Sequence, residues 1–195
     1  MSRVLLATRN VDKVAELQRI LAPYALVLEA AGYEPGPETG TSFAANALAK
    51  AREGVAFTGL PSVADDSGLT VDALNGMPGI LSARWAGRHG DDLANLELVL
   101  GQLSDVPDER RGAAFVCAAA YALPDGRSEV VLGELRGSLI REPRGTNGFG
   151  YDPVFVPTGY DVTSAELAPD EKDAISHRGQ AFRALAPLLA TALAA

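Results

Sequence analysis

The sequence predicts an α/β fold with a mixed β-sheet, held in one domain over residues 1–195. Near the N-terminus, an apolar run typical of a buried strand precedes a segment with the apolar spacing of an amphipathic helix. In the middle of the chain, two apolar runs flank the turn Pro124-Asp125-Gly126, which predicts a long β-hairpin. The chain is long enough for one sizeable core, and 47% of its residues are apolar, as in globular proteins.

Start and stop signals place the elements in order. Asn10 stands at the N-cap position of the first helix, which Pro23 ends, and Ser42, Asp91 and Ser176 precede three further helices. Clusters of Gly and Pro mark the loops. The expected elements are strand 4–8, helix 11–22, strand 26–30, loop 32–40, a helix to about residue 57, strand pieces 63–65 and 69–74, an irregular segment to residue 90, a helix to about residue 103, hairpin strands 113–123 and 128–140, a Gly- and Pro-rich segment 141–159, and a final helix to residue 193 that Pro187 bends.

The composition excludes several classes of protein. No apolar run approaches the ~20 residues that span a bilayer, and the first residues lack the parts of a secretory signal, so we expect a cytoplasmic protein without membrane contact. The single cysteine, Cys117, lies in an apolar run, which predicts a buried thiol and no internal disulfide. A net charge of −8 repels nucleic acid, whereas a small polyphosphate can bring a metal cation with it.

A candidate anion site lies where the first strand meets the first helix, because helix N-termini present backbone N–H groups that have no partner within the helix. Lys13 is one turn into the helix and can reach back to a bound anion. The alternative is an Asn N-cap followed by a solvated lysine. The glycine framework of a P-loop is absent. The segment consists of Thr8, Arg9, Asn10, Val11, Asp12 and Lys13.

A candidate metal site lies at the adjacent carboxylates Asp65 and Asp66, which follow a strand piece and precede Ser67 and a turn-permitting Gly68. Magnesium prefers one or two carboxylates together with water and phosphate oxygens. Glu38, in the upstream loop, is a possible further ligand. The alternative is an acidic turn with no ligand.

A candidate nucleotide site is indicated by glycines that let backbone approach a flat ligand, with aromatic rings to pack on it. The alternative is a glycine-rich turn anchored by core aromatics. Downstream, basic side chains stand beside another helix start. The residues concerned are the segment 145–152, which includes Phe149, Gly150, Tyr151 and Asp152, and then Lys172, His177 and Arg178.

Together these segments resemble the inosine triphosphate pyrophosphatase family, also called XTP/dITP diphosphatases. The match extends from Leu6 almost to the C-terminus. One departure is Ala45, where many relatives carry Glu. The matching pieces are Thr8-Arg9-Asn10 with Lys13, Thr41-Ser42-Phe43, Asn46-Ala47, Lys50-Ala51, Ala64 to Leu69, Pro78-Gly79, Ser82-Ala83-Arg84, Gly148 to Pro153, Ala165-Glu166, Glu171-Lys172 and Ile175-Ser176-His177-Arg178.

The resemblance implies an elongated mixed sheet flanked by helices in two lobes with the active site in a central cleft, and a homodimer. It implies that residues 8–13 contact the triphosphate and that Asp66 serves the metal and the attacking water. Glu38 is the nearer candidate for a second ligand. The nucleotide contacts that it implies are Ser67, Phe149 to Asp152, Lys172, His177 and Arg178.

The implied reaction is attack of water on the α-phosphorus of ITP, dITP or XTP, with magnesium pyrophosphate leaving. A carboxylate bound to Mg²⁺ is a poor base, so Asp65 and Asp66 are expected to divide the roles of ligand and base in a way that the sequence leaves open. Two alternatives are a house-cleaning pyrophosphatase for other bases and a nucleotide sensor without catalysis. A sensor needs no carboxylate to activate water, which favours an enzyme.

Overall fold

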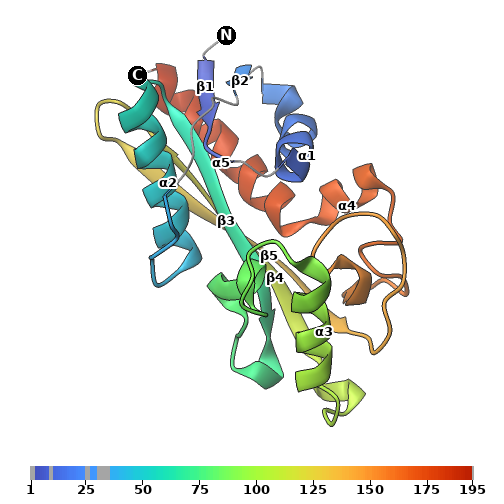
Figure 1. Cartoon of the computed structure of the whole chain (residues 1–195). Coiled ribbons are helices and arrows are strands. Elements are labelled where there is room, and N and C mark those ends of the chain that lie inside the picture. Colours follow the sequence, from blue (N-terminus) through green and yellow to red (C-terminus); the bar gives the residue numbers. More distant parts are fainter. Residues whose placement is uncertain (1–2, 9–10, 25–26, 30–35, 195) are drawn as a thin grey trace. The chain divides into compact units, whose positions relative to one another are not determined.

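The computed structural model describes residues 3–8, 11–24, 27–29 and 36–194 (Figure 1). Of residues 11–13, 15, 16, 22 and 27–29 only the backbone is described. The chain divides into two compact units: a first unit of residues 1–66, 117–133 and 177–195, and a second unit of residues 67–116 and 134–176.

The strands form one sheet in the order β2-β1-β3-β4-β5-β6. β1 pairs in parallel with both β2 and β3, whereas β5 pairs antiparallel with β6. The sheet is therefore mixed and the predicted fold class is confirmed. The strands are β1 (Arg3–Leu6), β2 (Val27–Glu29), β3 (Ser62–Val71), β4 (Gly112–Ala122), β5 (Ser128–Leu139) and β6 (Phe155–Pro157).

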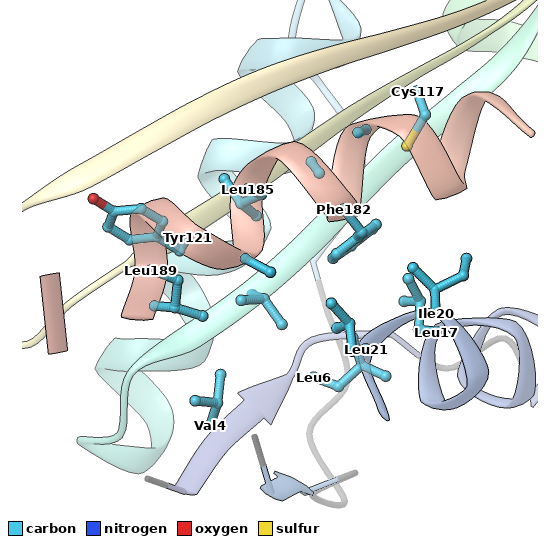
Figure 2. Close-up of a cluster of buried hydrophobic side chains, with 14 of the residues drawn as sticks. Val4, Leu6, Leu17, Ile20, Leu21, Cys117, Tyr121, Phe182, Leu185 and Leu189 are labelled. Atoms are coloured by element: carbon cyan, nitrogen blue, oxygen red, sulfur yellow. The ribbon is translucent and has the colours of Figure 1, made fainter. Parts of the chain in front are cut away.

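The first unit contains α1 (Val11–Leu21), α2 (Phe43–Thr58) and α5 (His177–Ala194), which cover opposite faces of its strands. Successive strand side chains point to opposite faces, so β1, β3 and β4 each supply residues to two clusters. α1 and α5 pack on one face, where Figure 2 shows Phe182 of α5 directed toward the labelled side chains of α1. Ala47 and Ala51 of α2 pack on the other face.

The second unit is built around its own core. It contains α3 (Asp92–Gln102), α4 (Pro169–Ile175) and the remaining parts of β3, β4 and β5 with β6. The ring centres of Phe115 and Phe155 lie 4.6 Å apart. The buried guanidinium of Arg111 donates to the backbone oxygens of Leu139 and Leu103, each at 2.7 Å, which satisfies polar groups at the edge of this core.

Most predicted elements are confirmed with shifts of a residue or two at their ends. Ser42 caps α2 by accepting a hydrogen bond from the backbone N–H of Ala45, and Asp91 caps α3. Pro187 lies inside α5. The short strand β6 and helix α4 were not predicted; β6 lies in the segment 141–159, which is rich in Gly and Pro. Asn10 lies outside the described residues.

One prediction about local structure is wrong. The strand pieces expected around Asp65 and Asp66 form one continuous strand, β3, and Gly68 makes no turn. A Cβ at Gly68 would collide with the side chain of Ser82 and the backbone oxygen of Gly79. Gly68 is therefore needed for close approach of backbone inside the second unit, and the acidic pair lies within a strand.

No helix in the described ranges is both long and apolar enough to cross a membrane. Cys117 is buried in the core of the first unit, as predicted (Figure 2).

Candidate active site

Asp65 and Asp66 point to opposite faces of β3. They are adjacent in a continuous strand, so their side chains alternate, and each meets a different helix. Both are almost fully buried, with 2% and 4% of their surface exposed. A buried carboxylate needs partners, and the partners of the two residues differ.

On one face, two polar residues of α2 hold Asp66. The Nδ2 of Asn46 donates a 2.9 Å hydrogen bond to Oδ2 of Asp66, and the Nζ of Lys50 lies 3.8 Å from its Oδ1. Asn46 and Lys50 are four residues apart and thus neighbours on one side of the helix. Each is followed by a buried alanine, Ala47 or Ala51, whose small side chain brings α2 close to the strand.

The same lysine binds the predicted ligand Glu38. Lys50 Nζ lies 2.7 Å from Oε1 of Glu38. Burial by itself lowers the pKa of Lys50, but the carboxylates of Asp65, Asp66 and Glu38 outweigh this, so the pKa lies above its usual 10.5. Lys50 is therefore an ammonium ion that joins the loop carboxylate of Glu38 to the strand carboxylate of Asp66.

Asn46 also fixes the loop that carries Glu38. Its Oδ1 accepts a 2.7 Å hydrogen bond from the backbone N–H of Gly40, while its Nδ2 binds Asp66. A Cβ at Gly40 would meet Oδ1 of Asn46 at 2.5 Å, so a larger residue there would displace the Asn46 amide. The side-chain amide of Asn46 thus holds both Asp66 and the loop that carries Glu38.

On the other face, Asp65 binds α5. Its Oδ2 accepts from Nε of Arg178 at 3.3 Å, and the thiol of Cys117 lies 4.0 Å from the same oxygen. The side chains of Asp65 and Arg178 are 1% and 2% exposed. His177, directly before Arg178 at the start of α5, is also buried. Asp65 therefore orients the first turn of α5.

In the second unit, Asp152 organises the loop of residues 145–152, here called the glycine-aromatic loop. Its Oδ2 accepts from the backbone N–H of Phe149 at 2.9 Å and from Nζ of Lys172 at 2.6 Å. Lys172 Nζ also lies 5.1 Å from the centre of the Phe149 ring, in cation–π range. A Cβ at Gly148, whose φ is +75°, would collide with Asp152. The structure therefore brings together three predicted site residues, Phe149, Asp152 and Lys172.

Two further contacts attach this loop to the rest of the second unit. The backbone N–H of Gly150 donates a 2.9 Å hydrogen bond to Oδ2 of Asp92, and the hydroxyl of Tyr151 donates to the backbone oxygen of Ser82 at 2.8 Å. Burial, aided by Asp92, raises the pKa of Tyr151, which keeps its hydroxyl protonated as a donor. The backbone donors of Phe149 and Gly150 are thus engaged within the protein.

The remaining predicted residues are placed only in part. Thr8 follows β1 and is half-buried, and Ser67 lies in β3 within the second unit. Val11, Asp12 and Lys13 form the first turn of α1, of which only the backbone is described. Arg9 and Asn10 lie outside the described residues.

Sequence reasoning gave no role in the site to three residues of these clusters, Asn46, Lys50 and Asp92, although Asn46 and Lys50 belong to segments that match the family. For Asn46 and Lys50 a signal existed, because two polar residues four apart stand among the alanines of one helix face. Asp92 gave none, since it follows the helix cap Asp91 and reads as an ordinary acidic residue in a first helical turn.

The donor set around Lys50 fits a hard divalent cation. Among the described residues, no group of three or more His, Cys, Asp and Glu is arranged to hold a metal ion. Magnesium needs fewer protein ligands, since one or two carboxylates suffice when water and phosphate oxygens complete its shell. Asp66 and Glu38 supply two carboxylates that already bind one cation, the ammonium of Lys50.

The sequence matches the model of the Ham1 family over residues 4–188. The chain belongs to the Ham1 family. A relative from Nocardia farcinica named "dITP/XTP pyrophosphatase" is 60% identical over 97% of this chain and 96% of its own length. The resemblance to XTP/dITP diphosphatases is therefore confirmed.

Two solved structures of Ham1 relatives have the same fold. A dITP/XTP pyrophosphatase from Mycobacterium abscessus is 61% identical with a TM-score of 0.77, covering 94% of this chain and 98% of that chain. A HAM1 protein from Coxiella burnetii is 41% identical with a TM-score of 0.89, covering 98% of this chain and 100% of that one.

Proposed function

We propose that this Ham1 protein hydrolyses ITP, dITP and XTP to the nucleoside monophosphate and pyrophosphate, with Mg²⁺ as its cofactor. The observation that carries the proposal is the cluster of buried Asp66, Lys50 and Asn46 with half-buried Glu38, in which two carboxylates lie around one ammonium ion. The relatives named dITP/XTP pyrophosphatase support the choice of substrate.

Asp66 and Glu38 would hold the metal in this proposal. When bound, Mg²⁺ would neutralise charge on the triphosphate and on the departing pyrophosphate. The hydrogen bond from Asn46 holds the Asp66 carboxylate in its orientation. Because the amide is neutral, the carboxylate keeps its negative charge for the metal. Water attacks the α-phosphorus, the bond from that phosphorus to the bridging oxygen breaks, and pyrophosphate leaves.

We assign Asp65 a different role from Asp66. Its carboxylate is turned to the opposite face of β3 and paired with Arg178, so it positions α5 and does not act as the base. No carboxylate then acts as the base: Asp66 would serve the metal, and the proton of the attacking water would pass to solvent. Asp66 and the phosphate oxygens are then the groups that orient the attacking water.

The nucleotide contacts extend the proposal. Residues 8–13, Thr8 to Lys13, would bind the triphosphate at the N-terminus of α1. The ring of Phe149, backed by Lys172, offers a flat surface for a base. Further contacts would come from Ser67, Gly150, Tyr151, Asp152, His177 and Arg178. We further propose a homodimer that works in the cytoplasm.

Product analysis with ITP and GTP in parallel, at equal concentration and with Mg²⁺, tests the proposed function. We expect pyrophosphate and IMP in equal amounts from ITP, and much less product from GTP. Release of inorganic phosphate and IDP would contradict cleavage at the α-phosphorus. Tight ITP binding without any product would instead indicate a sensor, and faster turnover of another triphosphate a different house-cleaning specificity.

A further inference from the structure

Lys50 is a buried cation placed among the carboxylates that the proposed function gives to the metal. Its Nζ lies 2.7 Å from Oε1 of Glu38 and 3.8 Å from Oδ1 of Asp66, and only 11% of its side chain is exposed. The carboxylate of Asp65 also acts electrostatically on Lys50. The ammonium thus neutralises part of the cluster's negative charge in the protein without metal.

We propose that Lys50 is a built-in counter-ion that competes with divalent metal for Asp66 and Glu38 and thereby weakens the binding of metal to the nucleotide-free protein. This inference rests on the proposed function, because it takes those two carboxylates as the metal ligands.

Charge and geometry support the competition. A divalent cation that bound Asp66 and Glu38 would take the oxygens that Lys50 now contacts, and the two cations would repel each other across a few ångströms in a poorly screened environment. A triphosphate adds negative charge that offsets this repulsion. The free protein would therefore bind metal weakly, and the metal would bind well only together with the triphosphate.

The contacts of Asn46 make the inference testable by substitution. Asn46 binds Oδ2 of Asp66 and the backbone of Gly40 independently of Lys50, so the carboxylate and the loop keep these supports when Lys50 is replaced. Lys50→Met keeps the length of the side chain and removes its charge. Lys50→Gln is a second neutral variant that retains a donor for Glu38.

Arg52→Met provides the matched control. Arg52 lies two residues further along α2, is exposed, and donates a 3.4 Å hydrogen bond to Oγ of Ser128. Its replacement removes the same unit of charge from the same helix, but at a position where water screens it. A difference between the variants at positions 50 and 52 therefore reports the contact with the carboxylates.

The experiment is titration of the full-length protein with Mn²⁺ in the absence of nucleotide. Electron paramagnetic resonance measures the free Mn²⁺, and the rise of Tm with added metal is a second readout. We expect Lys50→Met and Lys50→Gln to bind Mn²⁺ at least about 10-fold more tightly than the wild type, with a larger rise of Tm. Arg52→Met should bind like the wild type. Addition of Asp66→Asn to Lys50→Met should abolish the gain.

Three results would overturn the inference: unchanged or weaker Mn²⁺ binding in both Lys50 variants, an equal gain in Arg52→Met, or a gain that survives Asp66→Asn. Circular dichroism of each variant shows whether it is folded, and the Gln variant stands in if the Met variant is not. Hydrolysis of ITP by the wild type decides the proposed function separately, so a wild type that cleaves ITP while the Lys50 variants bind metal no better refutes this inference alone.

Discussion

Nε of Arg178 lies 3.3 Å from Oδ2 of Asp65, and both side chains are buried within the first unit. The pair joins β3 to the first turn of α5. Asp66, the next residue, instead faces α2 through Asn46. Two adjacent aspartates of one strand thus hold two different helices, which is the arrangement that the proposed division into a positioning role and a metal-binding role uses.

Loss of Asp65 should destabilise the protein strongly. Asp65→Ala leaves the guanidinium of Arg178 buried without this carboxylate, and removal of one partner of a buried ion pair costs about 3–5 kcal/mol. Urea unfolding followed by circular dichroism measures the change. The double variant Asp65→Asn, Arg178→Gln should recover part of the loss, because it leaves no uncompensated charge. A loss below about 1 kcal/mol in Asp65→Ala would show that the pair contributes little.

Asp66→Asn should remove most activity and leave the fold intact. The substituted amide can still accept from Nδ2 of Asn46 through its own oxygen, so the contact with α2 survives while the charge is lost. Loss of a group that positions or activates water costs ~10²- to 10⁴-fold in kcat, and loss of the metal costs more. Turnover of ITP at saturating Mg²⁺ is the measurement. Near wild-type turnover would remove Asp66 from the centre of the site.

The sequence predicted the sheet and most helices because their signals are local. Capping by Ser42 and Asp91 and the turn of the β-hairpin each depend on a few neighbouring residues. The strand around Asp66 was misjudged for the opposite reason. Adjacent charges and Gly68 read as a turn locally, but distant partners satisfy the charges, and contact with Ser82 explains the glycine.

Roles within the candidate site were predictable only as far as residue types allow. Asp66 and Glu38 could be named because carboxylates are the ligands that magnesium prefers. The role that we propose for Asp65 differs from theirs because of the face of β3 that each side chain takes, and that follows only once the strand is known to be continuous. Lys50 was noted only as part of the family match and received no role in the site, because a lysine in a helix normally reads as solvated.

Lys13→Ala should weaken triphosphate binding far more than monophosphate binding. Lys13 lies in the first turn of α1, where the helix N-terminus favours an anion and an added ammonium strengthens phosphate binding. Titration with a non-hydrolysable ITP analogue and with IMP, followed by calorimetry, compares the two ligands. Arg19→Ala, in the last turn of the same helix, is the control for loss of charge. Equal weakening of both ligands would place Lys13 away from the phosphates.

Base selection should depend on hydrogen-bond donors near the glycine-aromatic loop. Hypoxanthine and xanthine carry a carbonyl at position 6, whereas adenine carries an amino group there. A site that presents hydrogen-bond donors therefore pairs with the carbonyl and rejects the adenine amino group. The backbone N–H groups of Phe149 and Gly150 already donate to Asp152 and Asp92. The donors to the base are therefore expected from side chains, and Lys172 lies beside the Phe149 ring.

Guanine shares the carbonyl at position 6, so discrimination against GTP must come from its 2-amino group, through a clash or through loss of hydration without a partner. One unpaired buried polar group costs ~1–3 kcal/mol, which gives ~10- to 100-fold, so strong selection needs more than one such mismatch.

We expect ITP and XTP to exceed GTP and ATP in kcat/KM, and Lys172→Met to reduce kcat/KM for ITP more than the residual value for ATP. Steady-state kinetics on the four triphosphates measures both effects, with circular dichroism as the check on folding, because Lys172 also binds Asp152. Similar kcat/KM for ITP, GTP and ATP in the wild type would contradict selection by the base and leave the pyrophosphatase chemistry intact.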